Sequence, residues 1–330
     1  MSEPLSAALL GTWHVHADDY ARQAADHPGT RLATVWDADA DAAQEAGGRF
    51  GIPSTDDLDA VLADPAVGGV IVTTATTEHS AVIGRALRAG KHVFTEKLLA
   101  PTTDEAEALV ALAAQQGVAL VVSLPRLTEP TTLAVLDLLD RGALGRITYA
   151  RVRMAHDGWV GGWLPERFAD ASAAVGGALS DLGAHPVYLV QRFLGARPES
   201  ISASYTAGSG HAVEDNAVVT AAYADGAIGV AEASFVTVPG AFAFEVRGTA
   251  GSVLYGFGGE RLLAKGAAFD PEAWTELPLP APGPTPFDLW VAAAAGEADT
   301  AENLSAAVAL TTFVAAANSA AVDGTAVRLP

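Results

Sequence analysis

The first 124 residues alternate short apolar runs with segments in which apolar residues recur at helical spacing. The apolar runs, which we expect to be strands, lie at 5–10, 31–36, 69–74, within 90–97 and at 118–123. The segments between them, which we expect to be helices, lie at 16–25, 38–49, 56–63, 78–89 and 104–116. Strands and helices that alternate in this way predict right-handed crossovers and an α/β domain with a doubly wound parallel sheet.

The pattern changes after residue 124. Helices are expected at 131–141, 178–194, 287–295 and 303–322. Residues 147–154 alternate apolar and polar side chains as a half-exposed strand does, and several strand-like runs between 200 and 263 are separated by turn signals such as Asp225-Gly226. A proline-rich connection occupies 277–286. Residues 125–330 are therefore predicted to form an α/β domain with a large, mostly antiparallel open sheet.

One predicted strand ends in two charged residues that are candidates for catalysis. The apolar pair Val93-Phe94 is followed closely by Glu96 and Lys97. A strand covered on both faces accommodates valine and phenylalanine, whereas a carboxylate and an ammonium belong at its carboxyl end, where ligands bind in open α/β sheets. Lys97 is therefore the first candidate for catalysis, and Glu96 is expected beside the ligand. The alternative is a surface Glu–Lys pair after an edge strand.

Composition narrows the function classes. Half of the 330 residues are apolar and 18% are charged, which favours a packed globule of two domains. A net charge of −20 and scattered Lys and Arg argue against nucleic-acid binding. No run approaches the roughly 18 apolar residues of a membrane span. The N-terminal Met1-Ser2-Glu3-Pro4 lacks a basic segment, so no secretory signal is expected, and the absence of cysteine is compatible with a cytoplasmic location.

Gly11 stands at the first strand-to-helix turn, where dinucleotide-binding domains place a glycine-rich loop. Glycines at 13 and 16 would complete the G-x-G-x-x-G fingerprint, but the chain has Trp13 and His16 there. We expect Gly11, Thr12 and Trp13 to lie at the cofactor, with Trp13 pointing elsewhere or the cofactor posed differently. An ordinary tight turn is the alternative.

Asp37 ends the second strand, close to the position of the acid that binds the ribose hydroxyls of a dinucleotide. An unpaired carboxylate repels a 2′-phosphate, so NAD is expected in preference to NADP, and Asp39 is a candidate to share the role. The alternative is an acid favoured by a helix N-terminus. After the third strand, Thr74 and His79 are expected to line the ribose or nicotinamide, although a helix-capping segment looks the same and His79 is as easily structural.

The second cluster is Asp181 and His185, which share one face if the segment is helical. A carboxylate beside an imidazole orients it and raises its basicity, as a general base requires. Gly176-Gly177 before them permits close approach of a ligand or strand. The alternative is an exposed ion pair, but the apolar neighbours of these residues argue against full solvation.

Other candidates are less specific. Arg126 is expected either to bind substrate or to pair with an acid, and His156, Trp159 and Trp163 either to wall a polyol pocket or to plug the core. The histidines are dispersed, so no metal site is expected.

Together these landmarks resemble the Gfo/Idh/MocA family, named for glucose–fructose oxidoreductase and inositol dehydrogenase, over essentially the whole chain. The matching positions are Gly11, Asp37, Thr74 to His79, the 89–97 segment, Arg126, Pro130, 142–145, Gly176-Gly177, Asp181, His185, 214–216, 225–226, 248–251 and 319–330. The resemblance implies an N-terminal Rossmann domain with a nicotinamide cofactor, a C-terminal α/β domain whose open sheet mediates homodimers or homotetramers, and Lys97, Asp181 and His185 at the catalytic positions. The chain departs from the family pattern at Trp13, Ala75, Leu98 and Val175.

The expected function is an NAD(P)-dependent oxidoreductase that interconverts a secondary alcohol and a ketone on a sugar, polyol or sugar derivative. His185 takes the hydroxyl proton, Asp181 orients it, and Lys97 holds the same oxygen. Two other functions stay open: a redox-neutral elimination or glycoside cleavage with retained NAD, and a cofactor-binding sensor without catalysis.

Overall fold

The computed structural model describes residues 3–329, so Met1, Ser2 and Pro330, on which the expectations about a signal and the family tail partly rest, lie outside the described residues. The chain divides into two compact units. Unit 1 contains the residues up to 124 together with 284–311, and unit 2 contains 125–283 together with 312 onward. A boundary after residue 124 was predicted; the return of 284–311 to the first unit was not.

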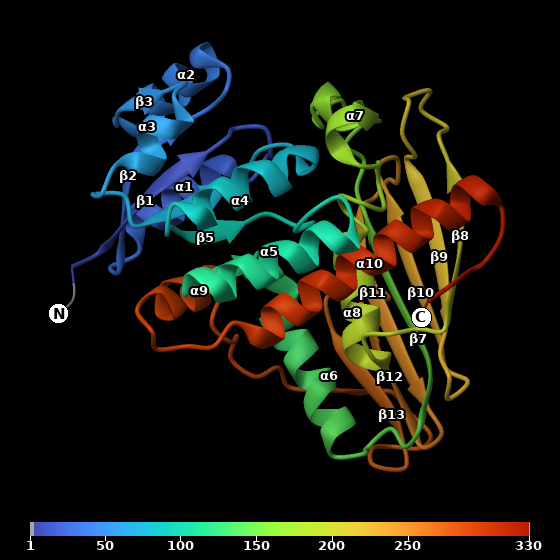
Figure 1. Ribbon diagram of the computed structural model, residues 1–330. Helices are drawn as coiled ribbons and strands as arrows, with labels where there is room; N and C mark the ends of the chain where they lie inside the picture. Colours follow the sequence, from blue (N-terminus) through green and yellow to red (C-terminus); the bar gives the residue numbers. More distant parts are fainter. Residues whose placement is uncertain (1–2, 330) are drawn as a thin grey trace. The chain divides into compact units, whose positions relative to one another are not determined.

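Unit 1 is built on a six-stranded parallel sheet in the order β3-β2-β1-β4-β5-β6 (Figure 1). Its strands are β1 Leu5–Leu10, β2 Thr30–Trp36, β3 Ser54–Thr55, β4 Gly69–Val72, β5 His92–Thr95 and β6 Leu120–Val122. Its helices are α1 Ala17–Asp26, α2 Ala40–Phe50, α3 Leu58–Ala63, α4 His79–Arg88, α5 Thr103–Gln116, α9 Pro286–Ala294 and the first part of α10 Ala301–Asp323. This strand order confirms the doubly wound sheet and places its switch point between β1 and β4.

Helices cover both faces of this sheet. Residues from α1, α2 and α9 pack into one cluster with Leu9, Ile71 and Phe94, while α4 lies against β4, β5 and α5. The contribution of α9 is specific, because Trp290 is fully buried and a Cβ on Gly69 would lie 2.7 Å from its ring. The sequence pattern predicted the α9 helix, but only the fold shows that it completes the core of unit 1.

Unit 2 contains a nine-stranded sheet in the order β14-β13-β12-β11-β7-β10-β9-β8-β15. Its strands are β7 Ile147–Ala155, β8 Ser200–Thr206, β9 Asn216–Ala222, β10 Ile228–Ser234, β11 Ala241–Gly248, β12 Gly251–Tyr255, β13 Leu262–Gly266, β14 Thr275–Glu276 and β15 Val327–Arg328. Its helices are α6 Pro130–Asp140, α7 Ala171–Ala174, α8 Ala184–Leu194 and the end of α10. The β7–β10 pair is parallel and the other pairs that flank them, β10–β9 and β11–β7, are antiparallel, which confirms a mostly antiparallel sheet.

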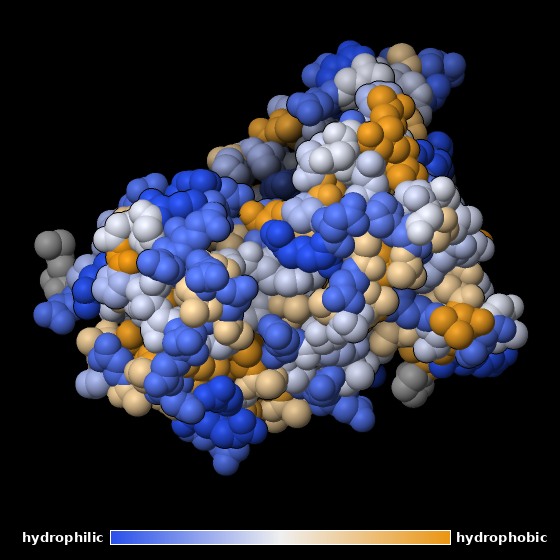
Figure 2. Space-filling view, turned by 90° about the horizontal axis from the view of Figure 1, so that it is seen from above, coloured by the Kyte–Doolittle hydropathy of each residue, from blue (hydrophilic) through white to orange (hydrophobic). Residues whose placement is uncertain are grey.

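Helix α8 packs against β7 and β10, where a Cβ on Gly229 would lie 2.5 Å from Val190. Ala150 and Val152 of β7 face this core, and the alternate residues Arg151 and Arg153 lie on the opposite, partly exposed face. By length and composition α10 matches a membrane span, a signal that core helices share, and 44% of its apolar window is buried. On the face seen in Figure 2, hydrophilic residues predominate and hydrophobic residues form separate groups.

Candidate active site

The turn after β1 is locked against β4. Gly11 adopts φ +89°, and a Cβ there would lie 2.5 Å from Thr74 Cγ2 and 2.8 Å from the Thr74 backbone. The Thr73 hydroxyl donates to the Gly11 carbonyl oxygen at 2.6 Å, and the Gly11 N–H donates to Trp36 O at 2.7 Å. Only glycine fits this position, so Gly11 is a required close approach rather than an ordinary turn.

Asp37 is held at the same edge of the sheet. Its Oδ2 accepts hydrogen bonds from the Thr12 N–H at 2.8 Å and the Thr12 hydroxyl at 2.7 Å. Asp39, the other candidate, caps α2 by accepting from the N–H groups of Asp41 and Ala42. The helix-cap alternative therefore applies to Asp39. Asp37 Oδ1 also accepts from the Asp39 N–H at 3.0 Å, and Asp37 remains the candidate for the ribose position.

Glu78 lies close enough to Asp37 for their charges to interact. Burial raises the pKa of Glu78, and the charge of Asp37 raises it further. Glu78 was not predicted to be a site residue. Two carboxylates at this edge strengthen the negative potential that opposes a 2′-phosphate.

Glu96 and Lys97 are both buried, with 2% and 4% of their surface exposed. This excludes a surface Glu–Lys pair. Glu96 Oε2 accepts from the Lys97 N–H at 3.0 Å and lies 3.9 Å from Lys97 Nζ. The opposite oxygen, Oε1, lies 2.7 Å from His16 Nδ1 and accepts from the Tyr20 hydroxyl. The Tyr20 oxygen in turn accepts from the Ser123 hydroxyl at 2.8 Å.

The charge of Glu96 is stabilised by its surroundings. Burial alone would raise its pKa, but His14, Lys97 and His16 together hold it well below its usual range. The expectation that the histidines are dispersed is wrong here, because the nitrogen and oxygen ligand atoms of His14, His16 and Glu96 lie within 4.8 Å of one another. That is a spacing a metal ion can use, although the Lys97 ammonium already compensates the carboxylate and opposes a second cation. The spacing His14-x-His16 beside the first turn was the available sequence signal.

His79 is a structural tether. Its ring is 1% exposed, burial lowers its pKa to about 4, and its Nδ1 lies 2.7 Å from the Leu98 carbonyl oxygen. The imidazole is therefore neutral near pH 7 and Nδ1–H donates to Leu98, which fastens the segment after Lys97. The Lys97–Leu98 peptide is cis, at the position where the family pattern has proline.

In unit 2 the two glycines precede a clamped turn. A Cβ on Gly177 would lie 2.1 Å from the Glu214 carbonyl oxygen. The Glu214 carboxylate accepts from the N–H groups of Gly177 and Leu179 at 2.8 and 3.0 Å, and burial raises its pKa. Glu214 thus holds the turn that leads to the catalytic candidates, a role that its sequence position within 214–216 did not reveal.

Asp181 does not share a helix with His185, because α8 begins at Ala184 and Asp181 lies in the preceding turn. The expected i,i+4 arrangement is wrong: the glycines and Glu214 hold residues 177–183 out of the helix. His185 Nδ1 lies 2.7 Å from the hydroxyl of Tyr188, which is 2% exposed and accepts from the Arg126 N–H at 3.2 Å. Tyr188, three residues after His185, was missed, although its spacing on a helix pointed to it.

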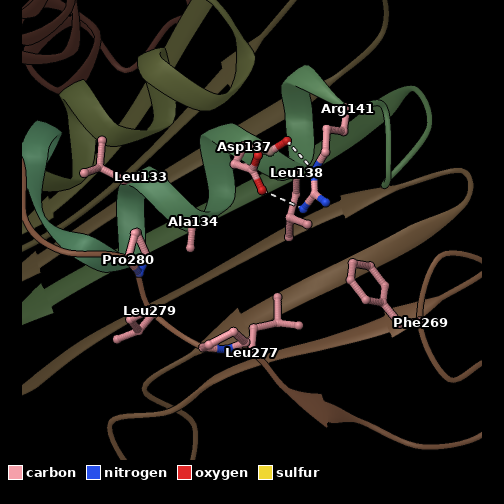
Figure 3. Close-up of a pocket in the computed structure, with 10 residues that line it drawn as sticks. Leu133, Ala134, Asp137, Leu138, Arg141, Phe269, Leu277, Leu279 and Pro280 are labelled. Atoms are coloured by element: carbon pink, nitrogen blue, oxygen red, sulfur yellow. Dashed lines mark hydrogen bonds and ion pairs between the residues drawn. The ribbon is translucent and has the colours of Figure 1, made fainter.

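Arg126 follows the alternative of pairing with an acid. Its Nη1 donates to Glu129 at 3.0 Å, and its guanidinium lies 3.9 Å from the centre of the Phe242 ring. His156 is partly buried beside Trp163, and the charge of Asp181 acts on it. A groove of about 520 Å³ lies elsewhere in unit 2, between α6 and the proline-rich segment, where Asp137 and Arg141 form an ion pair at 2.6 Å (Figure 3). Its lining includes none of the candidate catalytic side chains.

Comparisons with known proteins identify the family. Residues 5–124 match the family described as "Oxidoreductase family, NAD-binding Rossmann fold", and residues 132–254 match the GFO/IDH/MocA C-terminal domain. The chain belongs to the Gfo/Idh/MocA family. Among its relatives, 1,5-anhydro-D-fructose reductase of Ensifer adhaerens is 32% identical over 61% of this chain and 60% of its own length.

Two further relatives cover more of the chain. The scyllo-inositol 2-dehydrogenase (NAD(+)) of Bacillus subtilis (strain 168) is 27% identical over 82% of this chain and 80% of its own length. The crystal structure of GenD2 from gentamicin A biosynthesis, in complex with NAD, has a TM-score of 0.84 and 28% identity, and covers 100% of this chain and 97% of that one. For the reductase above and for two dTDP-sugar 3-reductases, the match spans only 46–60% of the relative's length.

Proposed function

We propose that this protein is an NAD-dependent oxidoreductase that interconverts a secondary alcohol and a ketone on a sugar, polyol or sugar derivative. The observation that carries the proposal is the buried Glu96–Lys97 pair at the end of β5, on the edge of the sheet where this fold binds dinucleotides. A buried ammonium beside an ionised carboxylate can bind a substrate oxygen and stabilise negative charge on it. The names of the relatives, which include a sugar reductase and an inositol dehydrogenase, support the substrate class.

The residues of unit 1 fit a nicotinamide dinucleotide. Gly11 lets the backbone pass close to Thr74. Asp37 directly follows β2, and Thr12 holds its carboxylate there, at the end of the strand where a ribose is bound in this fold. Thr12 binds Asp37, and Trp13 replaces the second glycine, so contacts to the pyrophosphate differ from those of a full fingerprint. Asp37 and Glu78 together support NAD over NADP.

The cofactor supplies the hydride acceptor, and the protein supplies position and charge. In our proposal His185 accepts the proton from the substrate hydroxyl, and Lys97 binds that oxygen and stabilises its negative charge as the carbonyl forms. Asp181 contributes negative charge near His156 and the substrate rather than a helical contact to His185. Tyr188 holds the His185 ring from behind.

Substitution tests these roles. Lys97→Met or His185→Ala is expected to lower kcat by a factor of roughly one hundred or more. Unchanged far-UV circular dichroism and unchanged NAD binding are the controls. Activity within a few-fold of wild type for both variants would refute the assignment, and turnover without net NADH would favour the redox-neutral reaction instead.

Cofactor choice is tested separately by thermal shift. A ligand held at one hundred times its Kd adds about 2.7 kcal/mol to the free energy of unfolding, so NAD is expected to raise Tm more than NADP at equal concentration. Asp37→Ala is expected to narrow that difference. A larger shift with NADP would contradict the role of Asp37.

We also infer a cytoplasmic homodimer or homotetramer that associates through the sheet of unit 2. Val218 of β9 and Ile228 of β10 are 44% and 48% exposed and lie on the face that α8 does not cover. Ile228→Glu is expected to lower the mass measured by light scattering to that of a monomer, with Trp274→Leu as the control. An unchanged mass would place the interface elsewhere.

A further inference from the structure

Three aromatic rings in unit 2 form a ladder from the core to the surface. Phe235 is fully buried, and the His156 ring stacks on it with centroids 5.0 Å apart and an interplanar angle of 11°. The Trp163 ring contacts His156 at a tilt of 53°, with ring centroids 4.7 Å apart, and is 54% exposed. The outermost of the three rings is therefore an indole open to solvent.

Polar contacts hold the outer rings in place. The Trp163 indole N–H donates to Asp157 Oδ1 at 3.0 Å, and the Trp163 backbone N–H donates to Gly158 O at 3.0 Å. His156 Nδ1 accepts from the Gly158 N–H, also at 3.0 Å. A Cβ on Gly158 would lie 2.9 Å from the His156 ring and 2.8 Å from Leu164, so glycine is needed where the loop folds over the imidazole.

Trp159 in the same loop shows what a tryptophan used for packing looks like. Its ring stacks on His211 at 4.1 Å and meets Phe235 edge-on at 4.9 Å. Its indole nitrogen is buried. Trp159 thus plugs the core, whereas Trp163, four residues later, keeps half of its surface in water while its orientation is fixed. Exposing a large apolar ring to water is unfavourable, so a ligand that covers the ring gains free energy by removing its surface from water.

The ladder also lies near a candidate catalytic group. Burial lowers the pKa of His156, and the charge of Asp181 acts against that shift. His156 is consequently a neutral ring between Phe235 and Trp163, and Asp181 is near enough to interact with it electrostatically.

We propose that Trp163 is a stacking platform for the C–H face of a six-membered ring, so that the enzyme prefers cyclic polyols and pyranosides to open-chain polyols. This inference rests on the function proposed above. Equatorial hydroxyls leave the axial C–H groups of such a ring on a flat face, which matches the negative face of an indole. An open-chain polyol presents no such face until its torsions are ordered, at a cost in entropy.

The test compares Trp163→Leu with Trp274→Leu, a substitution at another tryptophan of unit 2 that is 40% exposed and belongs to no candidate site. The probes are myo-inositol and methyl β-D-glucopyranoside as cyclic compounds, and sorbitol and xylitol as open-chain compounds. Each is measured with NAD by steady-state kinetics and by saturation-transfer NMR from the protein to the axial C–H protons.

Trp163→Leu is expected to lower kcat/KM for the cyclic probes at least about tenfold, mostly through KM, and to abolish saturation transfer. Trp163→Phe should restore much of both, and Trp274→Leu should change neither. An equal loss for cyclic and open-chain probes, an equal loss in both tryptophan variants, or no saturation transfer to any cyclic probe in the wild type would overturn the platform. Loss of activity in Lys97→Met but not in Trp163→Leu would overturn the platform alone, whereas full activity in Lys97→Met would overturn the catalytic assignment.

Discussion

Each unit holds a carboxylate away from bulk water beside its candidate catalytic residues. Different groups surround the carboxylate in each unit. Glu96 of unit 1 faces His14, His16 and Lys97, which outweigh burial and hold its pKa well below the usual range. Glu214 of unit 2 faces backbone N–H groups, and burial with Asp215 nearby raises its pKa. An ammonium and two imidazoles can keep a buried carboxylate ionised, whereas backbone N–H groups mainly hold it in position.

The difference separates two tasks. The carboxylate of Glu96 sets the charge around Lys97, so its ionisation matters for chemistry. The carboxylate of Glu214 clamps the turn at 177–179, so its oxygen atoms matter more than its charge. Substitutions at both carboxylates and at their neighbours test this difference.

Glu96→Ala is expected to lower the free energy of unfolding by about 3–5 kcal/mol, because the buried Lys97 ammonium loses its carboxylate. Glu96→Gln keeps the shape and one acceptor oxygen but removes the charge, so it should lower the free energy of unfolding by nearly as much as Glu96→Ala. Urea unfolding of the two variants measures both values. A cost below about 1 kcal/mol for Glu96→Gln would show that hydrogen bonding, not charge, dominates at this site.

His79 sharpens the contrast within unit 1, since burial prevails over the attraction of Glu96 and lowers its pKa from 6.5 to about 4. Between these values the unfolded chain binds the proton and the folded chain does not. His79 therefore does not lower the free energy of unfolding above pH 6.5, but it lowers that free energy by about 3 kcal/mol as the pH drops to 4. In His79→Gln, which can still donate to Leu98, this loss should vanish when stabilities at pH 7 and pH 4 are compared. An equal acid loss in wild type and variant would contradict the burial argument.

Glu214→Ala is expected to cost about 1–3 kcal/mol, because the N–H groups of Gly177 and Leu179 lose their acceptor, while Glu214→Gln should cost less than about 1 kcal/mol. The pH dependence has the opposite sign to that of Glu96. A raised pKa in the folded state means that the contribution of Glu214 is present below pH 4.5 and is lost as the pH rises. The contribution of Glu96 is present above pH 4.5 and is lost as the pH falls.

Unfolding curves of wild type and the two glutamine variants between pH 3.5 and 7 compare these signs directly. The titratable groups that face Glu96 are His14, His16, Tyr20, His79 and Lys97, and those that face Glu214 are Asp215 and Tyr205. If the free energy of unfolding changed with pH in the same direction in Glu96→Gln and Glu214→Gln, relative to wild type, the two carboxylates would not differ as proposed.

Tyr188→Phe is the mildest change. It removes one hydroxyl from His185 and from the Arg126 N–H, and is expected to cost about 0.5–1.5 kcal/mol of stability. If Tyr188 positions His185, the pH–rate profile should shift and kcat should fall while NAD binding is unchanged. A stability loss without any change in the profile would leave Tyr188 a structural role only.

The sequence predicted most of unit 1 because strands such as β1 and β4 are continuous apolar runs and its helices repeat at their own period. The two-residue strand β3, Ser54–Thr55, is polar and was not predicted. Unit 2 was harder at one point. Apolar residues continue across 178–194, so the pattern predicted one helix, but Gly176-Gly177 and the Glu214 carboxylate hold the first part as a turn. The separation of Asp181 from the helix of His185 follows from that contact between distant segments.

Local patterns determined which elements form, which of them alternate, and that Glu96 and Lys97 leave an apolar strand at its carboxyl end. The contact partners follow from the tertiary structure. His16 and Tyr20 contact Glu96 across 80 and 76 residues, Tyr188 contacts His185, and residues 284–311 join the core of unit 1. The physical reason is that periodicity records how much of a segment is buried, whereas the partner of a polar group depends on where the whole chain brings another polar group out of water.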